Sequence, residues 1–257
     1  MLKGLLPVLK KDVLIMFYSP IYYVCSLIFA LLSGYFFYSN IAYFGILSLQ
    51  ASGDPFLSDI LNLSDMVIKP FFGNIMVILL LLVPLLTMRS FAEEKKQGTI
   101  ELLFTYPISD WGCLLGKFFA VVVSYLGMLI WTIPCIVILT FLGSPDWGIV
   151  LSAYLGIFLA GLAFSAFGIF ASSITENQIV SAVIAFGGLL LLWAVGWMKR
   201  LGGDLLGKIL EYISMTTHTE SFAIGIIDTR DVLYFFIFSV FWLGITSRIL
   251  QQRYIKR

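Results

Sequence analysis

Long uncharged apolar stretches alternate with short charged stretches along the chain, and this alternation predicts its elements. No Asp, Glu, Lys or Arg occurs within six segments, at 13–53, 70–88, 118–145, 147–175, 177–198 and 232–247. A helix that crosses the hydrocarbon core of a bilayer needs about 20 consecutive apolar residues. The pattern therefore predicts six membrane-spanning helices, near 21–38, 71–88, 118–142, 149–174, 178–198 and 231–248.

The end of the first span is set by polar residues inside its long apolar segment. Ser39-Asn40 and the run Ser52-Gly53-Asp54-Pro55 interrupt that segment. We therefore expect the first span to end near residue 38. Residues 1–19 come before it and place apolar side chains on one helical face, with Lys3 and Lys10 on the other. This periodicity predicts an amphipathic helix that lies in the membrane interface.

Composition narrows the class of protein. The 257 residues are 60% hydrophobic and 12% charged, whereas a typical soluble domain is about 45–50% apolar and about 25% charged. Charge this sparse excludes a soluble enzyme, and a net charge of +1 gives no reason to expect a nucleic-acid partner. The expected fold is an all-α, polytopic membrane protein that forms a single transmembrane domain over 1–257.

The positions of Lys and Arg predict the orientation in the membrane. With the N-terminus in the cytoplasm, eleven of the 16 Lys and Arg residues fall in inner segments and five in outer ones. Cytoplasmic loops carry an excess of these residues. We therefore expect both termini in the cytoplasm.

Residues that commonly bind metals or cofactors are scarce. The chain has three widely spaced cysteines and one histidine, His218. Gly202 and Gly207-Lys208 have the spacing of a phosphate-binding loop, but Ile209 replaces the hydroxyl residue that would bind magnesium. We expect no catalytic residue, metal or cofactor on this chain. The six uncharged segments that form the spans contain no Asp, Glu, Lys, Arg or His, which argues against ion-coupled transport.

One inner loop, 89–117, holds most of the polar residues between the predicted spans. Gly98 interrupts its helical pattern, and Pro107 ends the short helix that the residues between them predict. Ser109 and Asp110 are candidate N-caps for the third span. Two interpretations remain open from spacing alone, a solvated loop and a docking element for a cytoplasmic partner.

The same loop resembles a known family. Its sequence Phe91-Ala-Glu-Glu-Lys-x-x-Gly-Thr-Ile-Glu-Leu-Leu-x-x-x-Pro107 is similar to the cytoplasmic loop of ABC-2-type permeases, the membrane subunits of ATP-binding-cassette exporters. Further similarity lies at 19–23, 33–37, 70–74, 172–178, 218–222 and 225–231. The segment 172–178 and the pair 218–222 and 225–231 are closest to the gliding-motility-associated permease branch.

The resemblance implies a mechanical role for the loop. In this family the short helix, here 98–106, is a coupling helix that docks in a cleft of an ATPase subunit. The coupling residues it implies are Glu93, Glu94, Gly98, Thr99, Ile100, Glu101, Leu102, Leu103 and Pro107. Glu101 is also expected to hold the N-terminal helix through Lys10 or Lys11.

The resemblance also implies the setting of the chain. The expected location is the bacterial inner membrane, and ATP and Mg would be bound by the partner ATPase. Further expected partners are a second permease, as homodimer or heterodimer, a companion subunit with a periplasmic domain, and membrane lipid. The implied activity is export or movement of a substrate. The alternatives are an ATP-driven mechanical complex of the gliding type and a channel or scaffold without an ATPase.

Two further features have two interpretations each. Gly161, Ser165, Gly168 and Ser172 form a stripe of small residues in the fourth predicted span, which favours either close packing within the chain or a dimer face. Segment 199–230 is either a re-entrant helical hairpin, as in related permeases, or a simple outer loop. We expect His218 and Glu220 to stabilise it.

Overall fold

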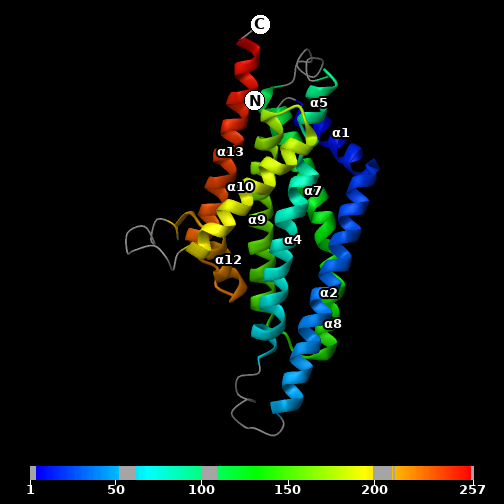
Figure 1. The fold of residues 1–257 in the computed structure, drawn as a ribbon, viewed down its shortest axis with the longest axis vertical. Coiled ribbons are helices and arrows are strands. Elements are labelled where there is room, and N and C mark those ends of the chain that lie inside the picture. The colour runs from blue at the N-terminus through cyan, green and yellow to red at the C-terminus, as the bar shows by residue number, and fades with distance from the viewer. Residues whose placement is uncertain (1–3, 52–61, 100–108, 199–209, 211, 256–257) are drawn as a thin grey trace.

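Long helices make up most of the chain, and most of them run along the long axis of the molecule (Figure 1). The computed structural model describes residues 4–51, 62–99, 109–198, 210 and 212–255. Their elements are α1 (Leu5–Tyr18), α2 (Pro20–Ala51), the π-helical turn η1 (Ser64–Ile68), α4 (Lys69–Thr87), α5 (Ala92–Lys96), α7 (Asp110–Leu129), the 3-10 turn η2 (Ile130–Thr132), α8 (Ile133–Leu142), α9 (Trp147–Ile174), α10 (Gln178–Met198), α12 (Met215–Ala223) and α13 (Thr229–Ile255).

Six helical stretches are long and apolar enough to cross a membrane. They are Pro20–Ala51, Ser64–Lys96, Asp110–Leu142, Trp147–Ile174, Gln178–Gly196 and Thr229–Gln252. The described residues contain no strand. The prediction of an all-α polytopic membrane protein with six spans is therefore confirmed.

Two of the predicted helix ends are wrong. Helix α2 continues to Ala51, well past the predicted end at residue 38. Ser39 and Asn40 both keep a backbone N–H, so they lower helix propensity slightly without breaking the helical hydrogen bonds. The third span begins at Asp110 rather than at the predicted 118. Ser109 caps it by accepting a hydrogen bond from the Gly112 N–H at 3.1 Å, which confirms Ser109 as a predicted N-cap of this span.

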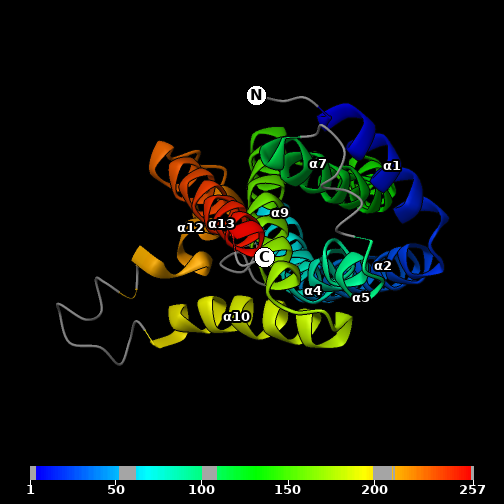
Figure 2. The ribbon, with the colours of Figure 1, turned by 90° about the horizontal axis from the view of Figure 1, so that it is seen from above.

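Helix α9 is the centre of the bundle. Figure 2 shows it in the middle of the view from above, and it packs against α4, α7, α10, α12 and α13. Within an apolar window of 18 residues, 67% of the residues are buried within the chain in the stretches that contain α4 and α9, against 22% in the α10 stretch and 28% in the α13 stretch. The apolar faces of α10 and α13 are therefore largely left for lipid or for another chain.

Helix α1 lies across one end of the bundle and packs mainly against α7 (Figure 1). The predicted N-terminal helix is present, but the face it turns to the protein differs from the predicted apolar face. Val8 and Asp12 are buried, whereas Leu6 is 74% exposed. Val8 lies close to Gly116 of α7, where there is no side chain in its way. The exposed apolar residues are the ones that remain for a membrane surface.

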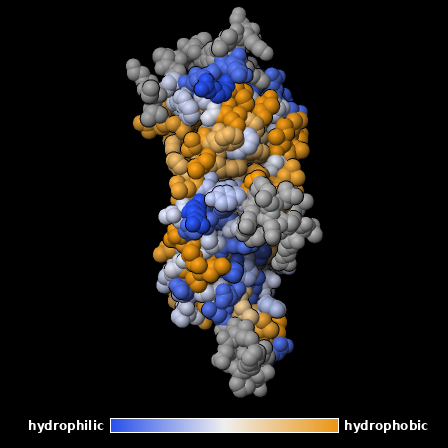
Figure 3. All heavy atoms as spheres, turned by 90° about the vertical axis from the view of Figure 1, so that its left-hand side faces the viewer, coloured by the Kyte–Doolittle hydropathy of each residue, from blue (hydrophilic) through white to orange (hydrophobic). Residues whose placement is uncertain are grey.

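Helix α12 lies beside the bundle rather than beyond its end (Figure 1). Phe222 of α12 packs on Gly156, nine residues into α9, which is about 13 Å from the start of that helix. Figure 3 shows a hydrophobic band in the upper part of this face and mixed hydrophilic and hydrophobic residues in the lower part. This position favours the re-entrant interpretation over a simple outer loop.

Candidate functional site

The predicted coupling segment starts at the end of the bundle where α1 begins and α13 ends (Figure 1). Glu93 and Glu94 lie in the short helix α5, and Gly98 and Thr99 follow it. The other predicted coupling residues lie outside the described residues; they are Ile100, Glu101, Leu102, Leu103 and Pro107.

Gly98 ends the helical turn of α5 by its backbone conformation. Its φ is +70°, in the left-handed region that glycine adopts without strain, and its N–H donates to the Lys95 carbonyl at 3.1 Å. Among the described residues, no atom lies within 4 Å of the position that a Cβ would take, so their spacing alone would permit a side chain here. The Thr99 hydroxyl then donates back to the Glu94 carbonyl at 3.3 Å. These bonds define how the chain leaves α5.

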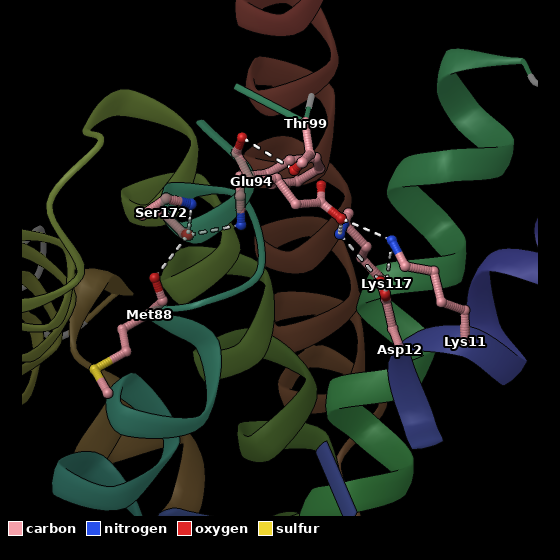
Figure 4. Close-up of polar contacts among 9 residues, drawn as sticks. Lys11, Asp12, Met88, Glu94, Thr99, Lys117 and Ser172 are labelled. Carbon is pink, nitrogen blue, oxygen red and sulfur yellow. Dashed lines mark hydrogen bonds and ion pairs between the residues drawn. The ribbon is translucent and has the colours of Figure 1, made fainter. Parts of the chain in front are cut away.

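Glu94 is the centre of a charged cluster that joins three helices (Figure 4). Its Oε1 lies 2.9 Å from Lys117 Nζ of α7 and 3.1 Å from Lys11 Nζ of α1. Lys117 Nζ also lies 3.1 Å from Asp12 Oδ2, and its side chain is only 4% exposed. The cluster therefore attaches α5 to both α1 and α7 through short charge-assisted contacts.

The charges of the cluster balance one another. Lys11 and Lys117 face Glu94 and Asp12, so two positive groups meet two negative groups. Lys117 Nζ also lies 5.1 Å above the centre of the Phe91 ring, which favours a cation. A buried ammonium without such partners would be strongly unfavourable. These partners offset the free-energy cost of burying the charged side chain of Lys117.

Most of this cluster is not apparent from the sequence. Lys117 falls at the end of the inner loop 89–117 and nothing near Asp12 indicates a role for it, because 105 positions separate the two in the chain. Glu101, which is expected to hold the N-terminal helix through Lys10 or Lys11, lies outside the described residues; among the described residues Lys11 pairs with Glu94. One signal is present in the sequence: Asp12 lies one turn after Val8, at the border of the predicted apolar face.

Ser172 attaches the same segment to the central helix α9 (Figure 4). Its Oγ accepts hydrogen bonds from the N–H groups of Phe91 and Ala92, both at 3.0 Å, and donates to the Met88 carbonyl at 3.1 Å. The ammonium of Lys95 donates to the Ser173 carbonyl in the last turn of α9. Helix α5 is thus bonded to the helix that contacts most of the bundle.

The rest of the small-residue stripe faces the interior of the chain. Gly161 lies against the ring of Tyr125 from α7, and Gly168 lies against Thr87 from α4. Ser165 is fully buried between them. These contacts are of the close-packing kind, since a larger side chain at either glycine would displace its neighbour.

A second polar cluster joins α12 to α13. His218 Nδ1 lies 2.7 Å from Asp231 Oδ1, and the imidazole stacks on Tyr234 with ring centres 3.9 Å apart. The Ser221 hydroxyl donates to the other Asp231 oxygen rather than to the imidazole. A serine nucleophile would need a hydrogen bond to the histidine base, so this arrangement stabilises the fold of 214–231. Glu220 is exposed and makes no contact in this cluster.

Metal-binding groups do not converge in the described part of the chain. No group of three or more His, Cys, Asp or Glu side chains lies close enough to hold an ion there. Cys25, Cys113 and Cys135 are buried free thiols.

Comparison with known proteins identifies the family. A search of curated proteins finds no match. A sequence model described as ABC-2 family transporter protein matches residues 6–220, which is 215 of the 257 residues. The match runs from α1 through most of α12 and includes the charged cluster and the segment that follows α5. The chain belongs to the ABC-2 family of transporter proteins, and it is a transmembrane component of the kind that forms the membrane subunit of an ABC transporter.

Proposed function

We propose that this membrane subunit couples ATP hydrolysis by a separate ATPase subunit to export or movement of a substrate across the bacterial inner membrane. The ATPase would dock on the segment 93–107 and would itself bind ATP and Mg. The observation that supports this proposal is the anchoring of α5, at the root of that segment, to α1, α7 and α9.

A lever must be short, stiff and attached directly to the elements it moves. Helix α5 is bonded to α7 through Lys117 and to α9 through Ser172 by contacts of 2.9–3.1 Å. These groups are buried, so a displacement of α5 must move them together or break several bonds at once. Helix α9 in turn contacts five other helices. A push at the docking segment would thereby reach most of the bundle.

Two observations support an orientation of the complex in which the α5 end of this chain faces the cytoplasm. Helix α5, the start of α1 and the end of α13 lie at one end of the molecule (Figure 1). The excess of Lys and Arg in the segments at this end favours the cytoplasmic side. A cytoplasmic ATPase would then contact α5 at the cytoplasmic surface of the membrane.

A single chain of six spans would be completed by a second permease. The outward faces of α10 and α13 are apolar and largely exposed in the single chain. A second copy of this chain, or a related permease, would cover part of these faces, and a substrate path would form between the two. The lipid bilayer would cover the rest.

Substitution of Gly98 tests the coupling. Gly98→Val forces a β-branched residue into the left-handed region and should redirect the docking segment, whereas Gly98→Asn should be tolerated because asparagine adopts this region more readily. The complex is purified through a tag on this chain, and retained ATPase subunit and substrate-stimulated hydrolysis are measured. If the Gly98→Val complex hydrolyses ATP like the native complex, or if the native chain retains no ATPase, the proposal is wrong.

The second candidate is an ATP-driven mechanical complex of the gliding-motility type that acts on periplasmic or envelope partners. It is supported by the similarity at 218–222 and 225–231, whose His218 and Asp231 form the bonded cluster between α12 and α13. A companion subunit with a periplasmic domain should then co-purify with the chain. Substrate movement in proteoliposomes that lack this companion would favour transport instead.

A further inference from the structure

A cavity of about 660 Å³ lies beside the charged cluster, between α1, the start of α2, the end of α4 and α5. Leu14, Ile15 and Leu86 form an apolar wall, and Arg89, Glu93 and Glu94 contribute to a polar end. The volume lies within the range of about 300–1,000 Å³ that is usual for ligand pockets. The cavity is therefore suited to a ligand with one polar and one apolar part.

Two buried polar atoms from residues that line the cavity lack partners. Among the described residues, neither Arg89 Nε nor Glu94 Oε2 has a hydrogen-bond partner. Arg89 Nη1 donates to Ser19 Oγ at 3.1 Å, but its Nε is 3.9 Å from Glu93 Oε2, too far for a hydrogen bond. Buried donors and acceptors in folded proteins nearly always have a partner. A ligand at the polar end of the cavity would supply the acceptor that Arg89 Nε lacks and the donor that Glu94 Oε2 lacks.

The charges around the cavity are equal in number. Lys11, Arg89 and Lys117 contribute three positive charges, and Asp12, Glu93 and Glu94 contribute three negative ones. A balanced wall gives no preference for a ligand with net negative charge. It is complementary to a headgroup that carries both a phosphate and an ammonium group.

We propose that this cavity binds one phospholipid with a primary-ammonium headgroup, phosphatidylethanolamine, from the leaflet at the α5 end of the bundle. The phosphate would accept from Arg89, and an ammonium N–H would donate to Glu94 Oε2. An acyl chain would cover Leu14, Ile15 and Leu86. The trimethylated ammonium of phosphatidylcholine has no N–H to donate, so it would leave Glu94 Oε2 without a partner.

The position of the cavity favours a lipid over a soluble headgroup. Ile15 is 52% exposed on α1, the helix that lies across one end of the bundle (Figure 1). An apolar wall of this kind is stabilised when a hydrocarbon chain removes it from water. Glycerophosphoethanolamine would satisfy the polar end but would leave the wall uncovered. The proposal does not depend on coupling to an ATPase.

Native mass spectrometry of the purified full-length chain tests this site. The delipidated protein is mixed with phosphatidylethanolamine, phosphatidylcholine or phosphatidylglycerol of the same acyl chains. We expect one phosphatidylethanolamine to be retained per chain, at least tenfold more tightly than the other two lipids. Ile15→Trp should abolish this retention by filling the cavity. Leu6→Trp is the matched control, because Leu6 is exposed on the same helix and does not line the cavity.

Three outcomes would overturn the proposal. The first is equal retention of phosphatidylethanolamine and phosphatidylcholine by the native chain, which requires no variant to fold. The second is undiminished retention by Ile15→Trp, or displacement of the lipid by equimolar glycerophosphoethanolamine. The third is the absence of any retained lipid on the native chain.

Discussion

The charged cluster at the root of the docking segment makes one prediction that can be tested without knowing the substrate. Lys117→Met removes the ammonium that joins Glu94 to Asp12 while keeping a side chain of similar length. The two carboxylates have side chains that are only 14% and 11% exposed, so they would be left close together with little access to water. The change should therefore lower the stability of the attachment between α5, α7 and α1.

The magnitude follows from the burial of the three groups. Breaking a buried ion pair by removing one partner costs about 3–5 kcal/mol. Lys11 remains 3.1 Å from Glu94 and is itself about half exposed, so it compensates part of the remaining negative charge. We therefore expect a loss of about 3 kcal/mol. For a chain of this size, that corresponds to a decrease in Tm of about 6–12 °C.

The assay is thermal unfolding of the detergent-solubilised chain, followed by the loss of its monodisperse peak in size-exclusion chromatography. Lys10→Met is the control, because Lys10 lies on the exposed side of the same N-terminal helix and should change Tm by less than about 2 °C. The triple variant Lys117→Met, Glu94→Gln, Asp12→Asn should recover part of the loss, since it removes the uncompensated charge. If Lys117→Met unfolds at the native temperature, the cluster does not hold these helices together and the reasoning fails.

Three further predictions concern the attachments of α9 and α12. Ser172→Ala leaves the N–H groups of Phe91 and Ala92 without their acceptor and should lower the free energy of unfolding by about 1–3 kcal/mol. It should also uncouple ATP hydrolysis from substrate movement, and retained coupling in proteoliposomes would contradict this. Gly161→Leu should lower stability by about 1–3 kcal/mol or more, because the new side chain meets the Tyr125 ring, whereas Gly73→Leu should be nearly neutral in the same melting assay since nothing lies within 4 Å of its Cβ position. His218→Phe keeps the stack on Tyr234 but removes the bond to the carboxylate of Asp231, so it should make the segment 214–231 more sensitive to limited proteolysis. An unchanged cleavage pattern would argue against a stabilising role for the bond between His218 and Asp231.

The spans could be recognised from the sequence because each is a local property of the chain. About 20 apolar residues without charge specify a membrane-spanning helix wherever they occur. The exact ends were less well determined, as the continuation of α2 to Ala51 illustrates. A helix end depends on caps and on packing as well as on hydropathy, so Ser39 and Asn40 carried less weight than their polarity suggested.

The roles of single polar residues could not be read in the same way. Lys117 looked like an ordinary residue at a membrane surface, and Ser172 looked like one member of a packing stripe. Their functions come from partners far away in the chain, Asp12 for the first and Phe91 with Ala92 for the second. The local pattern of the sequence does not indicate which distant residues come into contact.

The sequence by itself determined the class of protein, its six helical spans and the family motif at 91–107, because hydropathy and motif spacing are properties of the sequence itself. Only the tertiary structure decided that Glu94 and Ser172 attach that segment to α1, α7 and α9, and that a cavity opens beside them. The physical reason is that lipid burial is a local property of one segment, whereas these attachments are contacts between distant segments. Burial in lipid acts on each segment separately, whereas ion pairs and hydrogen bonds require two groups that packing alone brings within about 3 Å of each other.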